Sequence, residues 1–150
     1  MILAVERTSD RELPLFLHVA GAMVLVGALI VVAWTLIKAW RGDVDGFTNI
    51  AFRTLLYAAI PAFLVMRVSA QWLVDKGYDE DQAWIGIGFG ASDLGLLLLI
   101  VATVVAGIAS RRLRREGSAS PTLGRVAAVI TLIPLALYLV AIWAMTTKPT

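Results

Sequence analysis

Three ionisable side chains stand inside long uncharged stretches of this 150-residue chain, and they are the first candidates for chemistry. They are His18, Arg67 and Asp93. Ionisable groups are costly inside a bilayer, so they usually face a bundle interior or water and mark functional sites. Gln71 follows Arg67 by one helical turn and therefore shares its face. These four residues form the predicted site, which we call the polar cluster.

The opposite charges of Arg67 and Asp93 allow three interpretations. In the first, the two side chains form an ion pair, and a neighbouring polar side chain takes up their remaining hydrogen bonds. The pair then only fixes the helix register. In the second, the polar cluster is a pocket that binds an anionic headgroup, a quinone or a proton. In the third, Arg67 snorkels outward to lipid phosphate. Tyr57, on the Arg67 face, and Tyr138 are secondary polar positions.

Small residues on the same helical faces predict that the polar cluster is buried. His18 shares a face with Gly21. Asp93 shares a face with Gly86 and Gly90. Small residues mark the faces through which membrane helices pack. Gly86 and Gly90 also form a Gly-x-x-x-Gly motif, which is typical of helix dimers, so a homo-oligomer is one expected kind of partner.

The chain holds a single histidine and no cysteine, which limits its metal and redox chemistry. One histidine cannot supply both axial ligands of a bis-histidine haem, and without cysteine there are no disulfides or thiolate metal sites. His18, Met66 and Met145 are a soft ligand set that suits Cu(I), but isolated methionines ordinarily pack. We therefore expect no metal or other cofactor, with haem or copper as the alternative. No phosphate-binding loop, carboxylate pair or nucleophile beside a base is visible, so we expect no enzyme activity.

Four long apolar runs carry these residues. Two of the runs have no charge, and the other two have a single charge each, Arg67 or Asp93. They cover residues 13–37, 54–74, 82–110 and 126–147. A helix needs about 20 apolar residues to cross a bilayer core. The sequence therefore predicts an all-α integral membrane protein, an up-and-down four-helix bundle that forms one domain over residues 1–150. The predicted helices cover about residues 13–40, 48–74, 82–110 and 123–147.

Local signals refine this prediction. Ser9 and Glu12 have the spacing of a capping box, and Pro14 suits a first helical turn. They support a helix start shortly before or at the apolar run, which begins at residue 13. Pro61 and Pro134 lie inside predicted helices and should kink them.

Positive charge is concentrated on the first and third predicted loops, and positive loops stay cytoplasmic. The residues that carry it are Lys38, Arg41, Arg53, Arg111, Arg112, Arg114, Arg115 and Arg125. Both termini are therefore predicted to be extracytoplasmic, and the polar cluster lies in the outer half of a bacterial plasma membrane. Arg111, Arg112, Arg114 and Arg115 form a basic cluster that faces the lipid headgroups and also suits anionic lipid.

A resemblance adds to this interpretation. The segment Leu17–Ala22, followed by Val26 and Gly27, resembles the first helix of small bacterial four-helix membrane proteins related to the copper-resistance D type. The ending from Trp143 to Pro149 is also similar to some of them. The resemblance implies a polytopic helical protein tied to copper or haem. His18 is the only ligand that it carries over, because this chain lacks the further histidines.

The residues thus predict a non-enzymatic membrane protein, either an accessory subunit or a small-ligand binder that uses the polar cluster. The alternative is a haem- or copper-associated redox or transport component. The expected partners are the lipid bilayer and a membrane protein or a second copy. The net charge of +2 comes from arginines that flank the membrane, so we expect no nucleic-acid partner.

Overall fold

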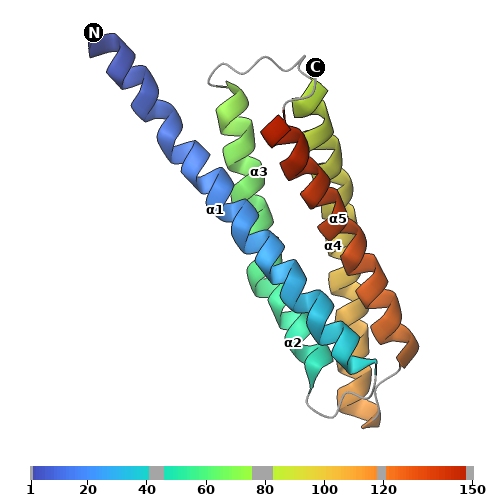
Figure 1. Ribbon diagram of the computed structural model, residues 1–150. Coiled ribbons are helices and arrows are strands. Elements are labelled where there is room, and N and C mark those ends of the chain that lie inside the picture. The colour runs from blue at the N-terminus through green and yellow to red at the C-terminus, as the bar shows by residue number, and fades with distance from the viewer. Residues whose placement is uncertain (1, 41–45, 76–82, 118–120, 148–150) are drawn as a thin grey trace.

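A computed structural model describes residues 2–40, 46–75, 83–117 and 121–147. All regular structure in these ranges is helical, which confirms the predicted all-α class. The elements are α1 (Ile2–Ala39), α2 (Phe47–Thr54), the π-helix η1 (Leu55–Ala59), α3 (Ile60–Asp75), α4 (Ala83–Glu116) and α5 (Pro121–Thr147). The helices lie alongside one another, and the first part of α1 and the last part of α5 point to the same end (Figure 1).

Four helical segments are long and apolar enough to cross a membrane. They are Arg11–Ala39, Phe47–Asp75, Ile85–Glu116 and Thr122–Thr147. The second segment joins α2, η1 and α3 into one continuous span. The chain is therefore a multi-pass membrane protein by the length and composition of its helices.

The start of α1 differs from the prediction. The helix begins at Ile2, so Ser9 lies inside it and does not cap its first turn. Residues 2–13 contain neither glycine nor proline, and most of them are good helix formers, so nothing in this segment stops the helix. Apolar runs locate the part of a helix that crosses the membrane, and they are silent about a polar extension. The first part of α1 stands apart from the other helices (Figure 1).

The second span changes its helical geometry directly before Pro61. Proline lacks a backbone N–H, and its ring crowds the carbonyl of the residue four positions earlier, which is Tyr57 here. Tyr57 lies in the middle of the π-helix Leu55–Ala59. The wider π-turn makes room for the proline ring without ending the span. Pro134, by contrast, lies within α5, which is an α-helix throughout.

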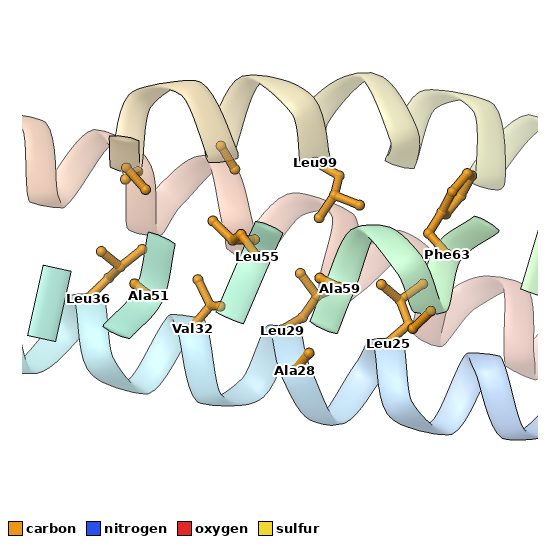
Figure 2. Packing of buried hydrophobic residues seen from close by; sticks show 14 of the residues in the cluster. Leu25, Ala28, Leu29, Val32, Leu36, Ala51, Leu55, Ala59, Phe63 and Leu99 are labelled. Atoms are coloured by element: carbon orange, nitrogen blue, oxygen red, sulfur yellow. The ribbon is translucent and has the colours of Figure 1, made fainter. Parts of the chain in front are cut away.

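The core is formed mainly by one face of α1 against the second span. Leu25, Leu29, Val32 and Leu36 of α1 are all fully buried and recur at helical spacing. They pack against Ala51, Leu55, Ala59 and Phe63 from the second span and Leu99 from α4 (Figure 2). The most extensive contacts join α4 to α5 and α1 to α3, whereas α3 and α4 touch little. A side-chain interaction between α3 and α4 is therefore one of the few contacts that join these two helices.

Close backbone contact fixes α1 on α3. A Cβ atom at Gly21 would lie 2.9 Å from the backbone nitrogen of Met66 and 3.0 Å from the carbonyl oxygen of Ala62. Only glycine permits this approach, as expected for a small residue at a membrane helix crossing. The crossing places His18, one turn before Gly21, directly beside the α3 backbone.

Candidate functional site

Arg67 and Asp93 bridge α3 and α4. The Nε atom of Arg67 lies 3.5 Å from Oδ1 of Asp93. The pairing predicted from the sequence is therefore present, between two helices that otherwise make few contacts. Opposite charges this close attract each other, and they do so more strongly in a low dielectric than in water.

Arg67 makes two further contacts. Its Cζ atom lies 4.2 Å from the ring centre of Phe89 on α4, a cation–π arrangement. Its Nη1 donates to Oε1 of Gln71 at 3.5 Å, and Nε2 of Gln71 donates to Oδ1 of Asp75 at 3.3 Å. The three α3 residues are spaced four apart, so they line up along one face. A ladder of polar side chains thus runs from Asp93 to the end of α3.

The burial of Asp93 was predicted wrongly. Its side chain is 67% exposed, and that of Arg67 is 29% exposed. The physical reason is that α4 packs on α5 through a different face. A Cβ at Gly88 would lie 2.7 Å from Cε of Met145, and one at Gly95 would lie 2.6 Å from Cζ of Tyr138. It is at Gly88 and Gly95 that α4 comes close to α5.

Gly86 and Gly90 lie on the same face of α4 as Asp93, and both are exposed. Among the residues that the structure describes, a Cβ atom at either position would meet nothing within 4 Å. Apart from the contact of Asp93 with Arg67, this face of α4 is therefore open in the described part of the chain. Spacing alone could not separate the two glycine pairs, because each of them occurs at helical intervals.

His18 is bound to the α3 backbone. Its Nδ1 lies 3.0 Å from the carbonyl oxygen of Met66. A carbonyl oxygen only accepts, so Nδ1 carries the proton and donates it, and in the neutral ring Nε2 is left as an acceptor. The same carbonyl accepts from Oγ of Ser69 at 3.0 Å. The structure thus places His18 beside the residue that precedes Arg67.

The two predicted tyrosines have different surroundings. Tyr57 is 74% exposed and lies on the surface of η1. Tyr138 is 4% exposed, and its ring centre lies 6.5 Å from that of Phe63. Its hydroxyl and Oγ of Ser92 are buried atoms without a hydrogen-bond partner in the described part of the chain. Sequence reasoning missed Ser92, whose only signal was its place one helical turn before Gly95.

The candidate copper ligands lie at separate contacts. Met66 meets His18 through its backbone carbonyl, while the methyl end of Met145 points at Gly88 on α4. Within residues 2–40, 46–75, 83–117 and 121–147, no three His, Cys, Asp or Glu side chains gather in a metal-binding group. Because Nδ1 of His18 donates to the Met66 carbonyl, Nε2 is the ring nitrogen that could bind a ligand.

The basic cluster lies at the far end of α4 from the polar cluster. Arg111, Arg112, Arg114 and Arg115 are all exposed. Nη2 of Arg114 donates to Oδ1 of Asn49 on α2 at 2.7 Å, and Oγ of Ser110 donates to the same oxygen at 3.2 Å. Asn49 was missed because a lone amide before an apolar run carries no pattern. These bonds tie α2 to α4.

Comparison of the chain with protein-family models, with characterised proteins and with solved structures finds no match. The resemblance of the His18 segment to the copper-resistance D type therefore stays a prediction.

Proposed function

We propose that this chain is a non-enzymatic accessory subunit of a bacterial plasma membrane, and that the face carrying Asp93 contacts its protein partner. In this proposal the four spans run up and down with both termini extracytoplasmic, because most of the positive charge lies at the helix ends around the first and third connections. The basic cluster, which was predicted for the third loop, belongs to the last turns of α4, which ends at Glu116 and not near residue 110. The polar cluster then lies in the outer half of the membrane.

The exposure of Asp93 carries the proposal. The residue lies within the apolar span Ile85–Glu116, yet 67% of its side chain is exposed. A carboxylate costs about 2.5–3.5 kcal/mol at the centre of a membrane helix on insertion scales, which is an upper bound for Asp93 in the outer half. Arg67 covers Asp93 from one side only. A polar or small-residue surface from outside the chain would lower this cost by replacing hydrocarbon around the carboxylate.

A protein partner fits this face better than a small anionic ligand. An anion would seek Arg67, but that guanidinium already faces Asp93, Phe89 and Gln71 and is 29% exposed. The more open group is the carboxylate, which repels anionic headgroups. Gly86 and Gly90 beside it leave the helix surface flat, and flat glycine faces suit the close packing of another helix.

The test is the size of the particle that contains the chain in its native membrane. Full-length chain is extracted with its surrounding lipid by a styrene–maleic acid polymer, and the protein mass of the particle is measured. We expect a complex larger than one chain, which the double change Arg67→Leu, Asp93→Leu converts to a monomer. Tyr57→Leu is the matched control, because Tyr57 is 74% exposed but lies on η1, ten residues before Arg67 and off the Asp93 face of α4. A monomeric parent would contradict the proposal.

A haem- or copper-associated component is the second candidate, and the geometry of His18 favours it. Metal-ligating histidines commonly donate one ring N–H to a backbone carbonyl and ligate through the other nitrogen. His18 donates from Nδ1 to Met66, which leaves Nε2 for a ligand. Haem or copper would supply redox chemistry there, and residues other than His18 would have to provide the remaining ligands. An optical spectrum and the copper content of parent and His18→Ala protein distinguish the candidates.

A further inference from the structure

Two buried hydroxyl groups, one on α4 and one on α5, have no hydrogen-bond partner among the described residues. They belong to Ser92 and Tyr138, which are 6% and 4% exposed. A buried hydroxyl without a hydrogen bond is costly, so native proteins satisfy nearly all of them, with ordered water where no protein group is in reach. We propose that a water molecule is bound between α4 and α5, where it bridges these two hydroxyls. The inference goes beyond the proposed function and does not depend on what covers the Asp93 face.

Ser92 lies on the face of α4 that packs against α5. Gly88, Ser92 and Gly95 are spaced four and three residues apart, so they follow one another along one face of the helix. Gly88 faces Met145, and Gly95 faces Tyr138. The numbering rises along one helix and falls along the other, so the two helices run antiparallel. Ser92 therefore lies between these two close contacts, inside the α4–α5 interface.

The two hydroxyls are close enough for one water molecule to join them. The Tyr138 oxygen lies against the position that a Cβ of Gly95 would take. Side-chain positions three residues apart on a helix lie about 5–6 Å from each other, so Ser92 and the Tyr138 oxygen are neighbours, yet they do not bond each other. Two O–H···O bonds of about 2.8 Å each let one water span such a gap. The facing side chains are small, because Gly95 has none and Ala141, opposite Ser92 in the antiparallel register, has a methyl group.

Ser92 differs from other buried serines and threonines of the spans. Thr35, Ser69, Thr103 and Thr131 each donate to a carbonyl of their own helix, and Ser110 donates to Asn49. A similar bond from Ser92 to its own helix is the alternative to a bridging water. That bond would leave the Tyr138 hydroxyl without a partner, whereas a water between the two satisfies both.

The surroundings of Tyr138 keep its hydroxyl away from water outside the bundle. Its ring centre lies 6.5 Å from that of Phe63 on α3, and its oxygen end lies on the backbone of α4 at Gly95. The ring is therefore held between α3 and α4. Buried tyrosines usually find a partner for their hydroxyl, and a bound water provides one here. The water's remaining bonds can go to helix carbonyls, which keep a second lone pair.

Radiolytic footprinting of the purified full-length protein tests the site. An X-ray pulse splits bound water into hydroxyl radicals, which oxidise the side chain beside it, and mass spectrometry locates the added oxygen. We expect Tyr138 to be oxidised although it is 4% exposed. Ser92→Ala should abolish this oxidation, because the water then loses one of its two anchors. Ser69→Ala should leave it unchanged and is the matched control, since it removes the same group from a buried serine that bonds its own helix.

Thermal unfolding of the same variants gives an independent measurement. If the water bridges the hydroxyls, Tyr138→Phe and Ser92→Ala should each lower the melting temperature, and the double variant should lose less than the two shifts together. If the Tyr138 hydroxyl is buried without any bond, Tyr138→Phe should instead raise the melting temperature. That rise would overturn the water site. So would a Tyr138 that stays unoxidised in the folded parent, or one that is oxidised equally in the parent and in Ser92→Ala.

Discussion

His18 and Met66 are joined at the point where α1 crosses α3. Nδ1 of His18 lies 3.0 Å from the Met66 carbonyl oxygen. One turn further along α1, Gly21 meets the backbone nitrogen of the same residue. Met66 is thus held through both of its backbone polar groups, by a hydrogen bond at one and close packing at the other. This contact sets the position of Arg67, the next residue, and so of the ion pair to α4.

Gly21→Ala should destabilise the protein by separating α1 from α3. The new Cβ would lie 2.9 Å from a backbone atom, which cannot swing aside as a side chain can. Overpacking of this kind costs about 1–3 kcal/mol. Thermal unfolding in detergent measures the change. Gly27→Ala is the control, because nothing lies within 4 Å of its Cβ position. Equal melting temperatures for the two variants would show that this crossing is not close-packed.

His18→Ala should lower stability by about 0.5–1.5 kcal/mol, the usual worth of one hydrogen bond. The loss is small because the Met66 carbonyl keeps its bond from Ser69. Denaturant unfolding in detergent checks the size. The leading proposal also predicts that parent and variant show no Soret band and no bound copper. A cofactor that is present in the parent and lost in the variant would promote the haem or copper candidate.

Arg67→Leu and Asp93→Leu should not be additive. The interaction free energy expected in detergent is about 1 kcal/mol, the scale of a solvent-accessible pair, since Asp93 is 67% exposed. A fully buried pair would instead cost about 3–5 kcal/mol when one partner is removed. A double-mutant cycle from thermal unfolding measures the interaction. Strict additivity would show that the two charges do not interact.

The orientation predicts which loops an impermeant thiol reagent reaches. In intact cells a cysteine in place of Gly77 should react, and one in place of Ser118 should be protected until the membrane is permeabilised. Ser118 is preferred to Gly46 for the inner loop, because Gly46 has a φ of 71°, which strains any other residue. The opposite labelling pattern would invert the topology and move the polar cluster to the cytoplasmic half.

The sequence predicted the spans and the Arg67–Asp93 pair because both depend on the high cost of charge in hydrocarbon. Charge-free runs located the helices within a few residues at most ends, and the two charges lay on neighbouring spans with opposite signs. The start of α1 at Ile2 was missed because its polar turns carry no hydropathy signal. Only the helix propensity of their residues indicates that these first turns of α1 are helical.

The face of Asp93 was missed for a different reason. Gly86 and Gly90 marked it as a packing face, and so did Gly88 and Gly95 for another face of the same helix. Which pair meets a neighbour depends on how α4 is rotated against α5. That rotation is set by contacts such as Tyr138 on Gly95, which join residues far apart in sequence. No local pattern encodes the choice.

The most direct test of the central claim, that protein covers the Asp93 face, is photo-cross-linking from that face in native membranes. A benzophenone amino acid replaces Leu97, which is 59% exposed one turn after Asp93, or Val140, which is 50% exposed on α5. Mass spectrometry identifies what each one captures. The account predicts discrete protein adducts from Leu97, lost on Asp93→Leu, and only lipid adducts from Val140. Lipid adducts alone from Leu97 would contradict it.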